Sequence, residues 1–345
     1  MIENELEREK LPMTRAVFNC IDSHTCGNPV RVVTSNRPDL YGKTMSEKRQ
    51  HFLSEFDWIR TGLMFEPRGH DAMSGSILYP PTDKEHDAGV LFIEVSGCLP
   101  MCGHGTIGTV TVALEEGLIS PKTPGLVNLD TPAGLVQARY QMHDGFVDSV
   151  ELTNIASFLH SQGVRLNIPG MGELVLDVSY GGNFYAIVEK QKNYPGLGKF
   201  SVDDIRRYSP VVRNAVNQHM NIVHPRDETI RHVSHVMWTD DPRDPGADMR
   251  NAVFYGDRGI DRSPCGTGTS ARVAQLVERG DLVLGQKFVH ESIIGSLFTG
   301  CAIEQTRVGE FPAIIPTIAG WARVTGHNKI SIDERDPYAH GFLLV

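Results

Sequence analysis

A sixteen-residue element occurs twice in the chain, and each copy begins with a cysteine. The segment CGHGTIGTVTVALEEG starts at Cys102, and it aligns without gaps on CGTGTSARVAQLVERG, which starts at Cys265. The two copies share Cys, Gly, Gly, Thr, Val, Glu and Gly in register. This repeat predicts a chain built from two related halves, each presenting one thiol in the same local setting.

Each copy predicts a glycine-rich turn that leads into a helix. Apolar residues follow each cysteine at helical spacing, and a glycine fifteen residues after it suits the position just past a helix C-terminus. The apolar positions are Ile107, Val110 and Leu114 in the first copy and Val273, Ala274 and Val277 in the second. At a helix N-terminus, the macrodipole and the free N–H groups favour a thiolate and bind a carboxylate. The repeat therefore predicts a substrate held between two thiols.

The amino-acid composition is typical of a globular protein and gives no sign of a nucleic-acid-binding surface or a membrane span. With 345 residues, 40% of them hydrophobic and 22% charged, the chain can bury the cores of about two domains. A net charge of −9 and the lack of a Lys/Arg-rich run exclude a nucleic-acid-binding surface. The N-terminal stretch is polar, and no segment approaches the roughly twenty apolar residues of a membrane span. We therefore expect a cytoplasmic protein.

The six cysteines are expected to remain thiols. A chain of this length needs no disulfide to stabilise its core, and the cytoplasm is reducing. Most of these side chains are expected to be buried as small apolar groups. They are Cys20, Cys26, Cys98, Cys102, Cys265 and Cys301.

The order of the predicted elements favours an α+β fold. Strand-like segments occupy residues 16–25 and 89–97, and further short strands follow the first cysteine helix. A helix is predicted over residues 201–219 and a loop over residues 239–250. Many short strands around few helices, without regular βαβ alternation, argue against a doubly wound sheet. We expect two pseudo-symmetric halves that meet near residues 155–170.

The two cysteines also admit other interpretations. A buried cysteine at an ordinary helix start would explain one copy, but not its recurrence in two halves that differ elsewhere. A Cys102–His104 nucleophile would suit acyl transfer, yet it explains only the first copy. Neither copy has a second ligand cluster at structural zinc spacing, so no metal is expected. A dithiol redox pair usually occupies one C-x-x-C turn, and it is the strongest alternative to acid–base catalysis.

Asp261 lies four residues before Cys265 in the segment IDRSPCGTG. One interpretation is a solvated loop carboxylate. The functional alternative is that Asp261 accepts a hydrogen bond from a substrate ammonium, opposite the helix N-termini that hold the carboxylate. The neighbouring Arg262 is expected to be structural or on the surface.

At these residues the chain resembles the proline racemase family. MCGHGTIG and DRSPCGTGTSAR are similar to its two signature blocks, and DSHTCGNPVRVV, RGHDAMSGSILYPP, YGGNFYAIV and ESIIGSLFTG extend the resemblance over essentially the whole chain after residue 15. The set is most similar to the bacterial 4-hydroxyproline 2-epimerases. The family's dehydratases carry a hydroxyl residue at the first thiol position, whereas both thiols are present here. Cys26 stands where the family often has glycine, so it is not a catalytic candidate.

The resemblance implies the fold of diaminopimelate epimerase. That fold has two pseudo-symmetric α+β domains, each a curved sheet wrapped around a central helix, with the active site at the domain interface. The implied halves are residues 16–158, joined by the C-terminal tail 330–345, and residues 159–329. Residues 1–15 are expected to form a flexible extension.

Carried over by position, Cys102 and Cys265 are the two acid–base thiols of this family. The residues that the resemblance places against substrate are Gly103, His104, Asp261, Gly266 and Thr267. No lysine is marked as a pyridoxal site, so no cofactor is expected: one thiolate would remove the C2 proton while the opposed thiol protonates the other face.

The activity implied by the resemblance is epimerisation of 4-hydroxyproline at C2. Proline racemase is the nearest alternative. A trans-3-hydroxyproline dehydratase and a non-catalytic dithiol redox or imino-acid-binding protein are alternatives of another class. The expected partner is the small-molecule substrate, and a homodimer is one expected assembly.

Overall fold

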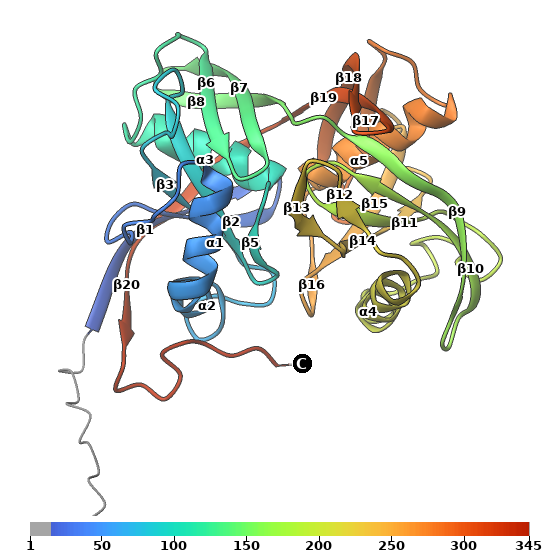
Figure 1. The fold of residues 1–345 in the computed structure, drawn as a ribbon, viewed down its shortest axis with the longest axis horizontal. Helices are drawn as coiled ribbons and strands as arrows, with labels where there is room; N and C mark the ends of the chain where they lie inside the picture. The colour runs from blue at the N-terminus through green and yellow to red at the C-terminus, as the bar shows by residue number, and fades with distance from the viewer. Residues whose placement is uncertain (1–14, 345) are drawn as a thin grey trace, which may run out of the picture.

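The computed structural model describes residues 15–344 and has an α+β architecture, as predicted. Figure 1 shows two lobes side by side, each with one central helix, α3 or α5, surrounded by strands. The predicted N-terminal extension lies outside the described residues except for Arg15, with which β1 begins. Within the described range, no helix is both long and apolar enough to cross a membrane.

Within the described residues, the first lobe contains nine strands and three helices. Its strands are β1 (Arg15–Thr25), β2 (Asn28–Val33), β3 (Ser74–Tyr79), β4 (Ala88–Glu94), β5 (Gly97–Leu99), β6 (Leu126–Thr131), β7 (Gly134–His143), β8 (Phe146–Thr153) and β20 (Ala322–Asp333). Its helices are α1 (Met45–Glu55), α2 (Asp57–Met64) and α3 (Gly103–Glu115).

The second lobe contains the remaining strands and helices. Its strands are β9 (Phe158–Ile168), β10 (Gly172–Tyr180), β11 (Phe184–Val188), β12 (Val223–His224), β13 (Asp227–Arg231), β14 (Val233–Asp240), β15 (Met249–Tyr255), β16 (Gly259–Ile260), β17 (Lys287–Glu291), β18 (Leu297–Val308) and β19 (Phe311–Gly320). Its helices are α4 (Val202–His219) and α5 (Gly266–Arg279).

The lobes are tied together by a strand that returns to the first lobe and by one strand pairing between the lobes. β20 follows the second lobe in the chain but pairs antiparallel with the whole of β1 in the first. A second antiparallel pairing, between β8 and β19, connects the sheets of the two lobes. These pairings hold the lobes in a defined register. The division into residues 16–158 with the tail 330–345, and residues 159–329, remains a prediction.

The two repeated segments form the central helices. Every residue of α3 from Gly103 to Ala113 is buried, and so is every residue of α5 from Gly266 to Leu276. Helices buried on all sides are typical of a core enclosed by other elements, here the curved sheets. The glycine after each helix has a positive φ, +65° at Gly117 and +79° at Gly280, which confirms the predicted ends of both helices.

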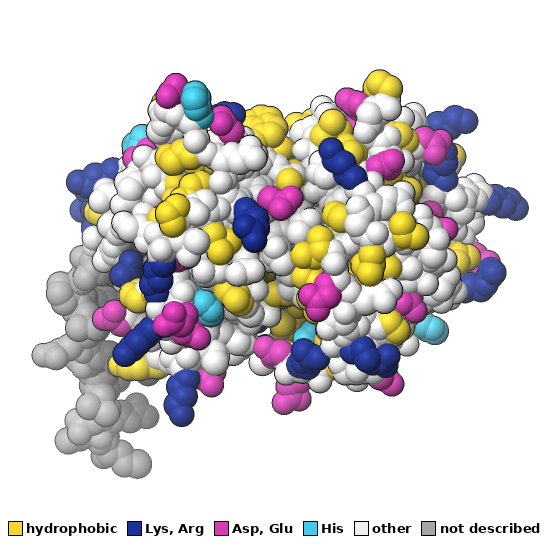
Figure 2. Space-filling view, turned by 90° about the horizontal axis from the view of Figure 1, so that it is seen from above, with side chains coloured by type: hydrophobic (Ala, Val, Ile, Leu, Met, Phe, Trp, Pro, Cys, Tyr) yellow, Lys and Arg dark blue, Asp and Glu magenta, His cyan; other side chains and the backbone are white. Residues whose placement is uncertain are grey.

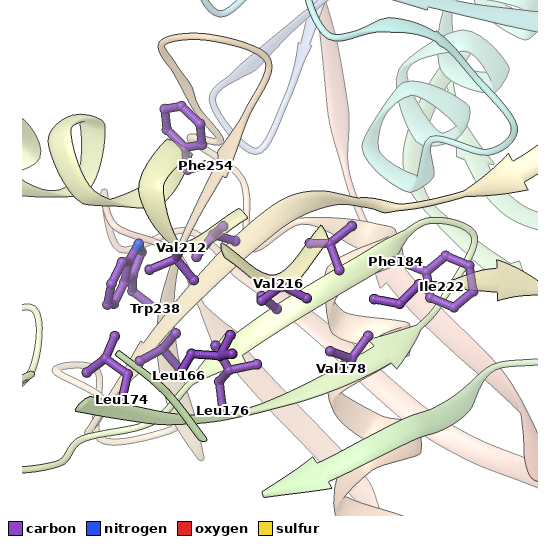
Figure 3. Close-up of a cluster of buried hydrophobic side chains, with 14 of the residues drawn as sticks. Leu166, Leu174, Leu176, Val178, Phe184, Val212, Val216, Ile222, Trp238 and Phe254 are labelled. Atoms are coloured by element: carbon purple, nitrogen blue, oxygen red, sulfur yellow. The ribbon is translucent and has the colours of Figure 1, made fainter. Parts of the chain in front are cut away.

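A separate core lies between α4 and the sheet of the second lobe. Figure 3 shows Val212 and Val216 of α4 together with Leu174, Leu176 and Trp238 from the strands beneath. The helix begins where the sequence predicts it, because Ser201 and Asp204 form a reciprocal capping box. On the outer face drawn in Figure 2, acidic and basic side chains are interspersed across the surface.

Sequence reasoning missed α1 and α2. Only Met45 and Phe52 are buried in α1, so its apolar periodicity is weak. The available signal was its start, where Thr44 is followed three residues later by Glu47 and accepts a hydrogen bond from the Glu47 N–H. The predicted loop over residues 239–250 is also shorter than expected, because β14 continues to Asp240 and β15 begins at Met249.

The N-termini of α3 and α5 meet backbone to backbone. A Cβ atom built on Gly103 would lie 2.6 Å from the Cα atom of Gly266, and a Cβ atom on Gly266 would lie 2.6 Å from the Cα atom of Gly103. Side-chain carbons do not approach backbone this closely, so both positions need glycine at this contact. The two glycines therefore set how near the helices, and the cysteines that cap them, approach each other.

We expect Gly103→Ala to lower the free energy of unfolding by about 1 to 3 kcal/mol, because the added methyl group must push the two helix N-termini apart. Chemical denaturation followed by circular dichroism measures this change. Gly198→Ala is the matched control, since Gly198 has no positive φ and its Cβ would meet nothing within 4 Å. Equal stabilities of the two variants would show that the helix contact tolerates a side chain.

Candidate active site

The two cysteines lie where α3 and α5 meet. Cys102 is the N-cap residue of α3, and Cys265 is the N-cap residue of α5. Each of the two residues is only 4% exposed, so the cysteines are buried in this junction. A surface groove of about 760 Å³ lies elsewhere, against Asp130, Asn154 and Asp227, and none of the predicted site residues lines it. The reactive groups are therefore in the interior and not in the large groove.

The five residues predicted to bind substrate lie in the same junction. Gly103 touches Gly266, and Thr267 belongs to the first turn of α5, whose backbone abuts Gly103. A ring nitrogen of His104 lies 3.6 Å from the carboxylate of Asp261, and both side chains are buried. The structure thus brings all the sequence-predicted site residues together, although their roles remain predictions.

Cys102 is surrounded by groups that interact with its sulfur. Its Sγ donates to a carboxylate oxygen of Glu94 at 2.9 Å, a contact that sequence reasoning did not anticipate. The same sulfur accepts from the backbone N–H of Gly105 at 3.3 Å and lies 3.6 Å from Nδ1 of His104. The thiol therefore has a carboxylate, a backbone N–H and an imidazole within reach.

Cys265 has different partners and a different backbone conformation. Its φ of +67° lies in the left-handed region, which costs a non-glycine residue about 1 to 3 kcal/mol and is characteristic of functional sites. The preceding loop is held by Asp261, whose Oδ1 accepts from both the N–H and the hydroxyl of Ser263 at 2.8 Å. The hydroxyl of Tyr185 lies 3.3 Å from Cys265 Sγ and 2.5 Å from the hydroxyl of Thr267.

The phenol of Tyr185 can stabilise a thiolate at Cys265. Burial raises the pKa of Tyr185 well above its usual value, so the phenol keeps its proton. A thiolate accepts hydrogen bonds and cannot donate them. When Cys265 is ionised, the Tyr185 hydroxyl therefore donates to the sulfur and accepts from the hydroxyl of Thr267.

Burial, and not the helix N-terminus, controls the ionisation of both thiols in the free protein. Desolvation raises the pKa of Cys102 well above its usual value, and the negative charge of Glu94 raises it further. Desolvation and the charge of Asp261 do the same at Cys265. The backbone N–H groups of Gly105 and Gly268 act in the opposite direction, but more weakly. In this buried junction, desolvation therefore outweighs the effect of the helix N-termini that the sequence predicts, and it favours the neutral thiols.

The other cysteines have structural surroundings. All six cysteines are free thiols, as expected. Burial raises the pKa of Cys20 to about 12, of Cys98 to about 12 and of Cys26 to about 11. The sulfur of Cys26 lies 3.5 Å from the backbone carbonyl of Trp321, and within the described residues it forms no hydrogen bond with Cys102 or Cys265. This agrees with the exclusion of Cys26 as a catalytic candidate.

Asn28 determines which nitrogen of His104 carries the proton. Its side-chain oxygen accepts from the backbone N–H of Arg262 at 3.0 Å, so its amide nitrogen must be the atom 2.9 Å from Nε2 of His104. The amide donates, and Nε2 accepts. The ring proton therefore lies on Nδ1, the nitrogen nearest to Asp261.

The same hydrogen bonds bear on metal binding. Glu94, Cys102 and His104 offer one ligand atom each within 4.8 Å of one another, which is a set that could hold a cation. A metal on His104 would have to displace Asn28 from Nε2 or the proton from Nδ1. Histidine ligands instead use one nitrogen for the metal and donate from the other. The donor set thus fits a proton-transfer site better than a metal site.

Three residues of this site were missed from the sequence: Glu94, Tyr185 and Asn28. Glu94 carries the clearest signal, because it is a charged residue at the end of β4, whose residues are all buried. A carboxylate in such a strand is rarely buried without a specific partner. Tyr185 and Asn28 lie within motifs that resemble the proline racemase family, but nothing in their spacing identifies them.

Comparison with known proteins agrees with this arrangement. The family model described as proline racemase matches residues 20–343. A protein named 4-hydroxyproline 2-epimerase from Shewanella loihica is 59% identical over 96% of this chain and 100% of its own length.

Two crystal structures have the same fold over nearly the whole chain. One is a hydroxyproline epimerase from Agrobacterium vitis with bound trans-4-OH-L-proline, with a TM-score of 0.87, 32% identity and coverage of 95% of this chain and 96% of that one. The other is a probable proline racemase from Agrobacterium radiobacter with bound carbonate, with a TM-score of 0.88, 33% identity and the same coverage. By family model, sequence identity and structure, the chain belongs to the proline racemase family.

Proposed function

We propose that this protein is a cofactor-independent 4-hydroxyproline 2-epimerase, which interconverts trans-4-hydroxy-L-proline and cis-4-hydroxy-D-proline. The observation that carries the proposal is the closed junction in which Cys102 and Cys265 cap two helices that touch through glycine. The name of the Shewanella loihica relative and the ligand bound to the Agrobacterium vitis enzyme support the choice of substrate.

In the proposed reaction each thiol serves one face of C2. A thiolate removes the C2 proton, and the opposed thiol donates its proton to the other face, which inverts the configuration. For one enantiomer Cys102 is the base and Cys265 the acid, and for the other enantiomer the roles are exchanged. No electron sink is needed beyond the substrate carboxylate, on which negative charge develops.

The helix N-termini supply the groups that would stabilise that charge. The first N–H groups of a helix have no partner within it, and those of α3 and α5 belong to Gly103 and His104 and to Gly266 and Thr267. Such N–H groups bind a carboxylate and stabilise developing negative charge in a site without water. Asp261 is proposed to accept from the substrate ammonium, because its Oδ2 is not used by Ser263.

Replacing either thiol by serine is expected to abolish epimerisation, with kcat reduced by at least about 10³-fold. An alcohol is too weakly acidic to form the base at neutral pH, and every turnover uses both groups. Polarimetry on Cys102→Ser and Cys265→Ser measures the loss, and circular dichroism checks the fold. Cys26→Ala is the control and should remain active. Full activity of Cys265→Ser with a dead Cys102→Ser would instead indicate a single Cys102–His104 nucleophile.

The proposed substrate is expected to be preferred over proline by at least about 10²-fold in kcat/KM, because polar groups that bind a ring hydroxyl are left unpaired when it is missing. Chiral chromatography of trans-4-hydroxy-L-proline and L-proline after incubation with the enzyme gives the ratio. Equal values would make proline racemase the better assignment. Trans-3-hydroxy-L-proline should give no dehydration product, and the appearance of one would favour a dehydratase.

A further inference from the structure

The carboxylate of Glu94 is a proton acceptor within hydrogen-bonding distance of Cys102. The two-thiol reaction gives this carboxylate no role. Glu94, the last residue of β4, accepts from Cys102 Sγ with one carboxylate oxygen at 2.9 Å and from Ser96 Oγ with the other at 3.0 Å. Its residue surface is 2% exposed. The guanidinium of Arg60 bonds the backbone carbonyl of Glu94 and not its carboxylate. In the described part of the chain, no Lys or Arg forms an ion pair with this buried carboxylate.

We propose that Glu94 accepts the proton of Cys102 and so generates the thiolate inside the closed site. This inference rests on the proposed epimerase function and concerns how its first base is formed. The S–H bond of Cys102 breaks and an O–H bond forms at Glu94, with no change of oxidation state. The thiolate then takes the C2 proton, and Cys265, still protonated, delivers its own proton to the opposite face.

After product release the protons must return to their starting positions. Cys102 and Glu94 are then both protonated, and Cys265 is the thiolate. Glu94 loses its proton and Cys265 regains one through solvent when the site opens, or the next substrate of opposite configuration is deprotonated by Cys265. Glu94 touches no substrate in this scheme, so it is a positioning residue that acts through Cys102.

The closed site makes such an acceptor necessary. Burial favours the neutral form of both thiols, and at 4% exposure Cys102 has little access to bulk water as a proton acceptor. Transfer over 2.9 Å to Glu94 keeps the charge of the pair unchanged. Burial raises the pKa of Glu94, which makes its carboxylate a stronger base than an exposed one.

Three titratable groups other than Cys102 lie near the Glu94 carboxylate: His104, Asp261 and Tyr255. His104 faces Glu94 from α3 and lowers the pKa of its carboxyl, whereas the negative charge of Asp261, from the loop before α5, raises it. Tyr255 on β15 is also near, and burial raises its pKa well above the usual value, so it is neutral. A single negative charge is therefore shared by Glu94 and Cys102 and can reside on either one.

The second copy of the repeat has no equivalent of Glu94. The residue at the corresponding position, eight before Cys265, is Asp257. Its side chain is 59% exposed and lies 3.9 Å from Arg213, so it does not face the site. Cys265 has the Tyr185 hydroxyl at 3.3 Å, and its carboxylate neighbour is Asp261, whose negative charge raises the pKa of the thiol. The two thiols therefore differ in their nearest partners: Cys102 donates to a carboxylate that can take its proton, whereas Cys265 lies beside a phenol that can donate to its thiolate.

The test is the pH dependence of kcat for Glu94→Gln, which keeps the shape of the side chain and removes the acceptor. In wild type, kcat should be independent of pH above neutrality, because the thiolate forms within the site. In Glu94→Gln the proton must leave to solvent, so kcat should fall about 10²-fold at pH 7 and rise about tenfold per pH unit below the pKa of Cys102, with KM within about threefold of wild type.

A purely electrostatic role for Glu94 predicts the opposite result. Removing its negative charge would then lower the pKa of Cys102, and activity at neutral pH would be kept or increased. That outcome would overturn the proposal. The pKa of Cys102 can be measured directly from the ultraviolet absorbance of its thiolate in two variants, Cys265→Ser alone and Cys265→Ser combined with Glu94→Gln. Comparing the two pKa values separates a proton acceptor at Glu94 from a purely electrostatic role.

Two further variants complete the test. Glu94→Asp keeps a carboxylate, so its kcat should be lower than that of wild type but should still be independent of pH above neutrality. This variant also serves as the test if Glu94→Gln does not fold. A kcat of Glu94→Asp that rises tenfold per pH unit would contradict the proposal. Glu291→Gln is the matched control, because Glu291 is equally buried but accepts from backbone N–H groups away from the thiols. Its pH profile should match wild type. Failure of wild type itself to epimerise would refute the proposed function, whereas an unchanged profile in Glu94→Gln would refute only this role.

Discussion

The contact between Gly103 and Gly266 is the constraint on which the site depends. It lets two helix N-termini meet without an intervening side chain, so that both capping cysteines and two sets of free N–H groups surround one small volume. Such close approach is stable only if the helices are held from behind. The curved sheets enclose α3 and α5 on all sides, and the pairings of β20 with β1 and of β8 with β19 keep the two lobes in register.

This close packing also determines the chemistry of the thiols. A junction that excludes water disfavours charge, so both cysteines lose the ionisation that an exposed helix N-terminus would favour. The site must then contain its own proton acceptors and donors. Glu94 beside Cys102 and Tyr185 beside Cys265 lie at the distances that such roles require. Burial, which strengthens every electrostatic interaction in the site, is thus also the reason why these neighbours matter.

The duplicated helices present chemically different thiols. Cys102 has an extended backbone with φ −139°, whereas Cys265 has φ +67°, and their hydrogen-bond partners come from unrelated elements. The two faces of a chiral substrate are themselves different, so identical surroundings for the two thiols are not needed. Both copies of the repeat share three features: the cysteine, the glycine that follows it and the helix. Together these features place a sulfur atom next to free backbone N–H groups.

The sequence alone determined the features that depend on local spacing. The repeat, its apolar periodicity and its glycines predicted both central helices and their ends, and the helix predicted over residues 201–219 is α4. The resemblance of the motifs supplied the family and the fold. Helix α1 was not predicted, because only two of its residues are buried and its apolar residues therefore show little helical periodicity. Only the tertiary structure decided that Glu94 reaches Cys102, that Tyr185 reaches Cys265 and that Asn28 reaches His104, because the position of each strand depends on sheet pairing. It also decided that burial raises both thiol pKa values, because desolvation is a property of the whole packed interior.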